Sequence, residues 1–141
     1  ENLVIVEENE EEAYQKISDE FGVEPVKITN GPEDMSFDQM IYDEGNQAAE
    51  ILYRANGEVL AYFINASYRD SSWGVDVEED VVDSYREKID GCEVTIRKYL
   101  TPETNMERFS VQFQYKGLEY FFIGTVKEEE VRIIIDNLHF Y

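Results

Sequence analysis

Two side chains in this sequence are typical nucleophiles or bases, and each of these residue types occurs once: His139 and Cys92. Catalysis by a serine or cysteine nucleophile needs a histidine base that a third group holds in place. His139 lies close to the C-terminus, between Leu138 and Phe140, which is typical of a partly exposed terminal side chain. Cys92 directly follows a turn glycine, with no nearby basic cluster that would activate its thiol. We therefore interpret Cys92 as a small buried hydrophobic residue and expect no enzymatic nucleophile.

Carboxylates are the most abundant reactive groups, with 32 Asp and Glu residues. A glycosidase needs two carboxyl groups at a defined separation in a cleft, with different pKa values. With so many carboxylates, close pairs arise by chance, so proximity alone indicates no active site. The acidic stretch at 76–83 suggests calcium, which takes about six to eight oxygen ligands, through Asp76, Glu78, Glu79, Asp80 and Asp83. Its spacing lacks the Asp-x-Asp-x-Asp-Gly pattern of a calcium loop, so we favour a solvated loop and expect no metal or cofactor.

Aromatic residues suggest a different kind of chemistry, noncovalent binding. The chain contains ten Tyr, eight Phe and one Trp, and most of them fall on or beside expected strands. We favour the interpretation that alternate aromatic side chains form a core beneath the helices. The alternative is an apolar groove on an open sheet face that holds a lipid, a peptide or a partner segment. For that groove we expect Tyr62, Trp73 and Tyr120 to contact the ligand.

The positions of these residues depend first on a helix near each end of the chain. Asn9 is a suitable N-cap, glutamates follow in the first turn, and Gly22 is a suitable end, so the spacing predicts a helix over 10–21. Near the C-terminus, residues 125–128 have the form of a capping box. They precede a predicted helix at about 126–137 with an apolar stripe of Val131, Ile134, Ile135 and Leu138.

Between the helices, the apolar residues repeat with the period of two that is typical of strands. The segment 82–89 also fits helical spacing, but the turn Asp90-Gly91 favours a strand there. Asn56-Gly57 favours a type I′ hairpin turn, and Lys116-Gly117 marks another turn. The expected strands are 26–29, 36–43, 47–55, 59–68, 82–89, 92–100, 108–115 and 118–124. This order predicts an α+β fold: a curved antiparallel sheet of about seven strands with an N-terminal and a C-terminal helix packed on one face.

Composition limits the kind of protein further. The chain has 141 residues, the size of one domain, and we treat residues 1–141 as a single domain. It carries 32 acidic and 12 basic side chains, for a net charge of −20, so nucleic acid is an improbable partner. The excess is greatest in residues 1–44, with 14 acidic and 2 basic side chains. With 43% hydrophobic residues the chain can form a core, and no stretch approaches the roughly 18 apolar residues of a membrane span.

The C-terminal run 109–138 carries the most distinctive pattern. A strand ending in Gln114-Tyr115-Lys116-Gly117 is followed by Glu119-Tyr120-Phe121-Phe122-Ile123-Gly124 and then by a Glu-rich helix. Glu11-Glu12-Ala13 and the hairpin at Asn56-Gly57 agree with the same pattern. The sequence resembles an uncharacterised extracytoplasmic domain of Gram-positive single-pass membrane proteins and lipoproteins, some with anti-sigma-like N-terminal regions. It departs from that family at Gln114, in a region that often carries Trp.

The resemblance implies a sensory or regulatory domain outside the membrane, with a sheet shaped like the half-barrels of bacterial sigma regulators and lipoprotein carriers. It transfers no catalytic residue, and it implies that a membrane anchor or lipoprotein signal precedes Glu1. We therefore expect a non-enzymatic module that binds a protein or hydrophobic ligand on its open sheet face. A carboxylate-based hydrolase and a purely structural or adhesive acidic domain are the alternatives, and the oligomeric state is open.

Overall fold

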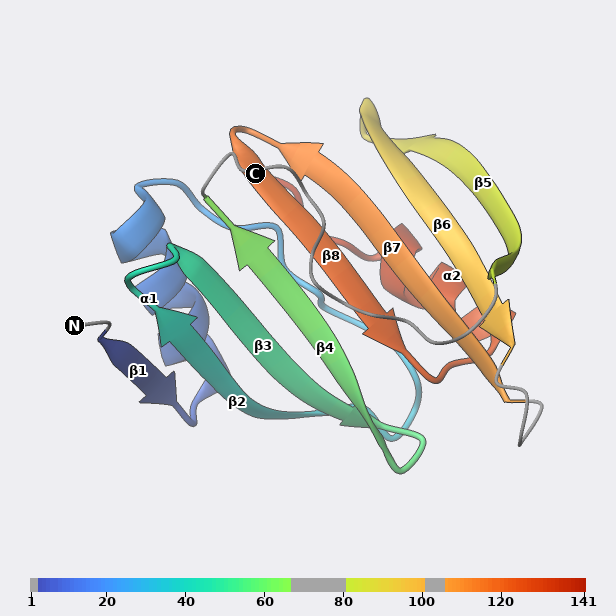
Figure 1. Cartoon of the computed structure of the whole chain (residues 1–141), viewed down its shortest axis with the longest axis horizontal. Coiled ribbons are helices and arrows are strands. Elements are labelled where there is room, and N and C mark those ends of the chain that lie inside the picture. Colours follow the sequence, from blue (N-terminus) through green and yellow to red (C-terminus); the bar gives the residue numbers. More distant parts are fainter. Residues whose placement is uncertain (1–2, 67–80, 101–105) are drawn as a thin grey trace.

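A single antiparallel sheet dominates the computed structural model, which describes residues 3–66, 81–100 and 106–141. In this part of the chain the sheet has eight strands, in the order β1-β2-β3-β4-β8-β7-β6-β5, and both helices lie behind it in Figure 1. The predicted α+β class is confirmed, with eight strands in the sheet where about seven were expected; β1 was not predicted as a strand, and residues 26–29 are not a strand of the sheet. The strands are β1 (Val4–Glu7), β2 (Ser36–Asp43), β3 (Ala48–Ala55), β4 (Glu58–Asn65), β5 (Val81–Ile89), β6 (Cys92–Leu100), β7 (Glu107–Tyr115) and β8 (Leu118–Gly124).

Three tight hairpins build most of the sheet. The loops Asn56-Gly57, Asp90-Gly91 and Lys116-Gly117 join β3 to β4, β5 to β6 and β7 to β8. In each loop both residues have positive φ, from 46° to 82°, as a type I′ turn requires. The halves β1–β4 and β5–β8 then meet where β4 pairs with β8, with Tyr62 opposite Phe122.

Capping residues determine where the two helices begin and end. In α1 (Glu10–Phe21) the Glu12 backbone N–H donates to Asn9 Oδ1 at 3.0 Å, and Gly22 ends the helix with φ of 72°, as predicted. The second helix, α2 (Glu128–Asp136), begins two residues later than expected. Its N-cap is Lys127, which has an extended backbone and donates its N–H to Glu130 Oε1 at 2.8 Å. The capping box therefore lies at 127–130, two residues later than the predicted 125–128.

Residues 25–29, which we call the crossing segment, correct the strand predicted at 26–29. The segment is extended, but no strand in the described part of the chain pairs with it. Its backbone pairs instead with His139, near the C-terminus. The Lys27 N–H donates to the His139 carbonyl at 3.1 Å, and the His139 N–H donates to the Lys27 carbonyl at 2.9 Å. Val26 and Ile28 are buried against the core of the helix-covered side.

The main core fills the space between the sheet, the crossing segment and the helices. Its largest fully buried side chains are aromatic, and they include Tyr53, Tyr62, Tyr120, Phe109 and Phe122. This confirms that alternate aromatics of the strands form the core. A smaller cluster of Tyr99, Phe121 and Ile123 lies on the opposite face of the sheet, because neighbouring strand residues point to opposite faces.

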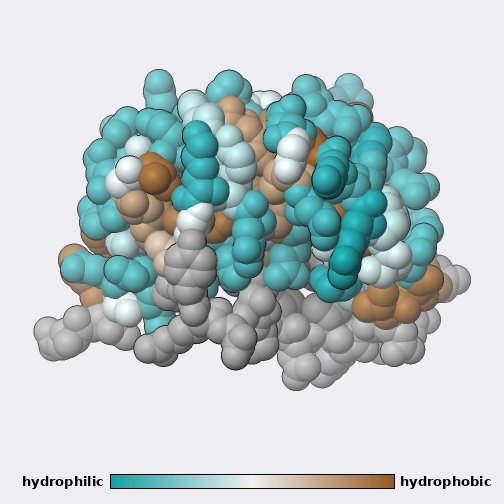
Figure 2. Space-filling view, turned by 90° about the horizontal axis from the view of Figure 1, so that it is seen from above, coloured by the Kyte–Doolittle hydropathy of each residue, from teal (hydrophilic) through white to brown (hydrophobic). Residues whose placement is uncertain are grey.

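The surface matches the acidic composition. Hydrophilic residues predominate on the face seen in Figure 2, and apolar side chains form small separate patches. Cys92 is buried, as predicted, and burial raises the pKa of its thiol. Neither described helix has the length and apolar composition needed to cross a membrane.

Candidate binding cavity

The ligand contacts predicted from the sequence lie in the core. Tyr62 on β4 and Tyr120 on β8 stack with ring centroids 5.9 Å apart, and their exposed fractions are 0% and 1%. Strand alternation turns both rings toward the helices rather than toward the open face, which corrects their expected position. Trp73 lies outside the described residues. The structure therefore places Tyr62 and Tyr120 in the core and not on an open face.

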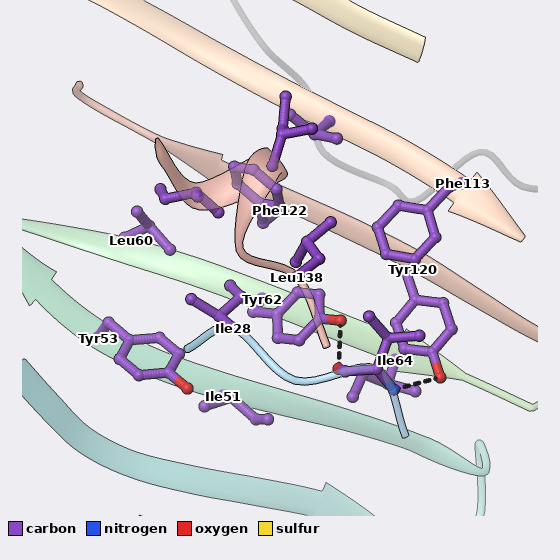
Figure 3. Close-up of a cluster of buried hydrophobic side chains, with 14 of the residues drawn as sticks. Ile28, Ile51, Tyr53, Leu60, Tyr62, Ile64, Phe113, Tyr120, Phe122 and Leu138 are labelled. Atoms are coloured by element: carbon purple, nitrogen blue, oxygen red, sulfur yellow. Dashed lines mark hydrogen bonds between the residues drawn. The ribbon is translucent and has the colours of Figure 1, made fainter. Parts of the chain in front are cut away.

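Tyr62 and Tyr120 hold the backbone of the crossing segment. The Tyr62 hydroxyl donates to the Val26 carbonyl at 2.7 Å, and the Val26 N–H donates to the Tyr120 hydroxyl at 2.9 Å (Figure 3). Buried backbone groups need such partners, and no neighbouring strand supplies them here. Burial raises the pKa of Tyr120 to about 12 and that of Tyr62 well above its ordinary value. Both hydroxyls are therefore neutral at physiological pH.

A third tyrosine begins a chain of hydrogen bonds that leads to the surface. The Ile28 N–H donates to the Tyr14 hydroxyl at 3.3 Å, and the hydroxyls of Tyr14 and Tyr53 are 2.8 Å apart. Tyr53 donates to Glu10 Oε2 at 2.7 Å. Because the Tyr53 proton points at Glu10, Tyr14 is the donor between the two hydroxyls. We call this chain, from the Ile28 N–H through Tyr14 and Tyr53 to Glu10, the tyrosine relay.

Burial sets the protonation state of the relay. It raises the pKa of Tyr14, against smaller opposing effects of the hydrogen bonds to Tyr53 and Ile28. It also raises the pKa of Tyr53, which the neighbouring Tyr14 and Glu10 raise further. Phenols with raised pKa values stay protonated at physiological pH, so they act as hydrogen-bond donors and not as nucleophiles.

The relay forms one wall of a cavity of about 410 Å³ between α1, the crossing segment and the start of β2. Small-molecule sites typically measure about 300–1,000 Å³ and combine apolar walls with a few converging polar groups. This cavity has that composition, because carboxylates, hydroxyls, one ammonium group and apolar side chains all line it. Its lining residues are Glu10, Glu11, Tyr14, Lys27, Ile28, Thr29, Met35, Ser36, Phe37 and Tyr53.

Two aromatic rings lie near Lys27, the one basic residue among the described residues that line the cavity. The Lys27 ammonium lies 5.5 Å from the centroid of the Tyr14 ring and 5.6 Å from that of Tyr141. Phe37 meets Tyr53 edge to face, with ring centroids 5.9 Å apart. The wall thus already holds one ammonium group against a tyrosine ring, which is a favourable cation–π arrangement.

Carboxylates outside this cavity form ion pairs, accept hydrogen bonds or face solvent, and they form no metal site in the described part of the chain. In a groove of about 640 Å³, Arg132 of α2 donates to both carboxylate oxygens of Glu87 on β5, with Nη1 2.8 Å from Oε1. This pair ties the edge of the sheet to the helix. Over residues 3–66, 81–100 and 106–141, no group of three or more His, Cys, Asp or Glu side chains is placed to hold a metal ion. Of the residues considered for calcium, only Asp83 is described, and it accepts the Ser84 N–H at 2.9 Å.

The residues of the cavity carried only a partial signal in the sequence. Glu10 and Tyr14 are four residues apart, so they lie on one face of the predicted helix. Tyr14 also interrupts an apolar stripe with a hydroxyl that needs a partner once it is buried. Tyr53, however, is 39 residues from Tyr14, and no local pattern indicates that the two hydroxyls meet.

Comparison with known proteins identifies a family for most of the chain. A family model described as a domain of unknown function, DUF4367, matches residues 25–138. The match begins at the crossing segment and includes β2 through α2, whereas β1 and α1 precede it. Searches of curated proteins and of solved structures give no significant match. On the extent of the family match, the chain belongs to the DUF4367 family, whose function is unknown.

Proposed function

We propose that this protein is a non-enzymatic binding module, with a sensory or regulatory role, in a membrane-anchored protein of a Gram-positive bacterium. The domain lies outside the cytoplasmic membrane, and its ligand enters the cavity beside the tyrosine relay. Sequence resemblance to extracytoplasmic domains supports the location. The observation that carries the binding role is the relay itself, which joins the cavity surface at Glu10 to the backbone of Ile28.

The relay gives a ligand a route to change the position of α1. A ligand that binds Glu10 competes for the carboxylate that accepts the Tyr53 proton, and Tyr53 in turn accepts from Tyr14 of α1. Because β1 directly precedes α1 in the chain, a shift of this helix acts first on β1 at the edge of the sheet. Binding in the cavity is thereby converted into a change in how α1 packs on the sheet.

Hydroxyl chemistry favours recognition over covalent catalysis at this site. Burial keeps Tyr14 and Tyr53 protonated, and neutral phenols are weak nucleophiles. They are good donors toward a carboxylate, and a hydrogen bond to a charged group is worth about 1.5–3 kcal/mol. Here the two phenols donate within the relay, and Tyr53 fixes the Glu10 carboxylate at the cavity surface, where that carboxylate can accept from a polar ligand group.

A nuclear magnetic resonance screen tests the binding role. A library of small neutral, cationic and anionic compounds is added to the ¹⁵N-labelled domain, and we expect at least one compound to shift the amides of Glu10, Ile28 and Phe37. Ser36 is exposed and lines the cavity, so Ser36→Phe should occlude it and abolish the shifts. Ser84→Phe, at an exposed position on β5 outside the cavity lining, is the matched control. Shifts that survive Ser36→Phe, or no shifts at these amides, would contradict the proposal.

The proposed location has its own test in the full-length protein. Protease added to intact cells should digest an extracytoplasmic domain, whereas a cytoplasmic control protein stays whole. Digestion that occurs only after lysis would place the domain on the cytoplasmic side and refute this part of the proposal.

A further inference from the structure

The charges of the cavity wall select among ligands. Glu10 uses Oε2 to accept from Tyr53, and Oε1 has no hydrogen-bond donor in the described part of the chain. Glu11, beside it in the first turn of α1, is exposed and forms no ion pair with any described residue. Two carboxylates with unused acceptor capacity therefore face a cavity whose lining includes a single basic residue, Lys27.

Another part of the cavity lining is apolar and aromatic. Met35 and Phe37 are half-buried and belong to the cavity lining. Their side chains offer contact area to a short hydrocarbon chain, and burying such a chain contributes about 0.8 kcal/mol for each methylene group. The Lys27 ammonium already lies over the Tyr14 ring, 5.5 Å from its centroid, so a ligand cation is left to the carboxylates of Glu10 and Glu11.

The net negative charge of the protein also favours cationic ligands over anionic ones. Residues 1–44 carry 14 acidic and 2 basic side chains, and the whole chain has a net charge of −20. A field of this sign raises the local concentration of cations and lowers that of anions. Anionic ligands are therefore disfavoured twice, by the cavity wall and by the protein as a whole.

We propose that the ligand group bound in this cavity is a primary ammonium on a short alkyl chain. The ammonium donates to the free Oε1 of Glu10, and the alkyl chain packs against Phe37. The same chemistry is offered by a small organic amine and by a lysine side chain on a partner protein. This inference rests on the proposed binding role of the cavity and adds the chemical class of its ligand.

A titration with three compounds of similar shape tests the ligand class. We expect n-butylammonium to shift the amides of Glu10, Glu11 and Ile28, n-butanol to bind at least about tenfold more weakly, and butyrate to cause no shift. Binding of n-butylammonium should weaken as salt is added, because exposed charges are screened. A lysine-containing peptide, compared with the free amine, shows whether a partner protein or a small molecule is the better source of the group.

Variants of the first turn of α1 locate the contact. Glu10→Gln keeps an acceptor for Tyr53 but removes the charge, and we expect about tenfold weaker binding of n-butylammonium. Glu12→Gln removes a carboxylate from the same turn but outside the cavity lining, and should leave binding unchanged. If Glu10→Gln unfolds the domain, Glu11→Gln replaces it, with a smaller expected loss of affinity.

The outcomes separate this inference from the binding role. Equal binding of n-butanol and n-butylammonium, or equal losses in the Glu10 and Glu12 variants, would overturn the ammonium inference while the cavity remains a binding site. If library compounds shift the cavity amides but n-butylammonium does not, the ammonium inference is likewise overturned while the cavity remains a binding site. If no compound of any class shifts these amides, both proposals fail.

Discussion

Replacing Tyr53 by Phe removes one hydroxyl from the middle of the tyrosine relay and leaves the ring in place. The ring is buried at 1% exposure and contacts Phe37 edge to face, so its packing is retained. The hydroxyl donates to Glu10 at 2.7 Å and accepts from Tyr14 at 2.8 Å. The variant therefore isolates the contribution of the hydrogen bonds from that of the aromatic core.

The expected loss of stability follows from the two hydrogen bonds of the Tyr53 hydroxyl. A hydrogen bond to a charged group contributes about 1.5–3 kcal/mol, and the value here is at the low end because the Glu10 carboxylate is exposed and regains water. The buried Tyr14 hydroxyl loses its acceptor, which costs about 1–3 kcal/mol. We expect Tyr53→Phe to lower the free energy of unfolding by about 2–4 kcal/mol. At this chain length, that corresponds to a melting temperature lower by about 6–12 °C.

Urea denaturation followed by circular dichroism measures this loss, with an unchanged m-value as evidence that the folded state is intact. Tyr115→Phe is the control, because its hydroxyl donates to the Tyr141 carbonyl at the surface and its loss should cost less than about 0.5 kcal/mol. In Tyr14→Phe/Tyr53→Phe no buried hydroxyl of the pair is left unpaired, so the double variant should lose less than the sum of the single variants. A loss below about 0.5 kcal/mol for Tyr53→Phe, or strict additivity, would refute the relay.

Three further changes test other parts of the structure. Tyr62→Phe leaves the buried Val26 carbonyl without its donor and should cost about 1–3 kcal/mol in urea denaturation. Gly124→Ala places a Cβ 3.0 Å from Leu60 Cγ in the sheet and should cost about 1–3 kcal/mol, measured by thermal unfolding. Burial raises the pKa of Glu50, so its ionisation opposes folding and stability falls as pH rises through that pKa. Glu50→Gln should therefore be more stable than the wild type at neutral pH, and the difference should disappear below the ordinary pKa of glutamate.

Local signals in the sequence determined those parts of the fold that were predicted correctly. Helix α1 has its bounds as predicted because Asn9 and Gly22 act within the helix itself. The hairpin turns are equally local, since glycine at positive φ is needed at each one. The pairing of β4 with β8 joins residues 61–65 to 119–123, and a local pattern does not specify a partner so distant in the chain.

The error at residues 26–29 has the same origin. Alternation of apolar residues is equally compatible with a strand and with an extended segment that side chains hold. The groups that hold Val26 come from Tyr62 and Tyr120, which are 36 and 94 residues away. The strands that carry both tyrosines are apolar on both faces, so the sequence pattern did not indicate which face each ring occupies.

The way the crossing segment is held bears on how a ligand signal could spread. Strands β1–β8 are joined by backbone ladders between neighbouring strands. The crossing segment depends instead on the hydroxyls of Tyr14, Tyr62 and Tyr120 and on its bridge to His139. Each such bond contributes about 1 kcal/mol net, and a ligand can shift a conformation only by its difference in affinity for the two states. If the proposed ligand binds at Glu10, we therefore expect weak binding to alter the contacts of α1 with Ile28 but not to open the sheet. We therefore expect such a signal to stay within α1 and the crossing segment, at the N-terminal boundary of the region that the family model matches.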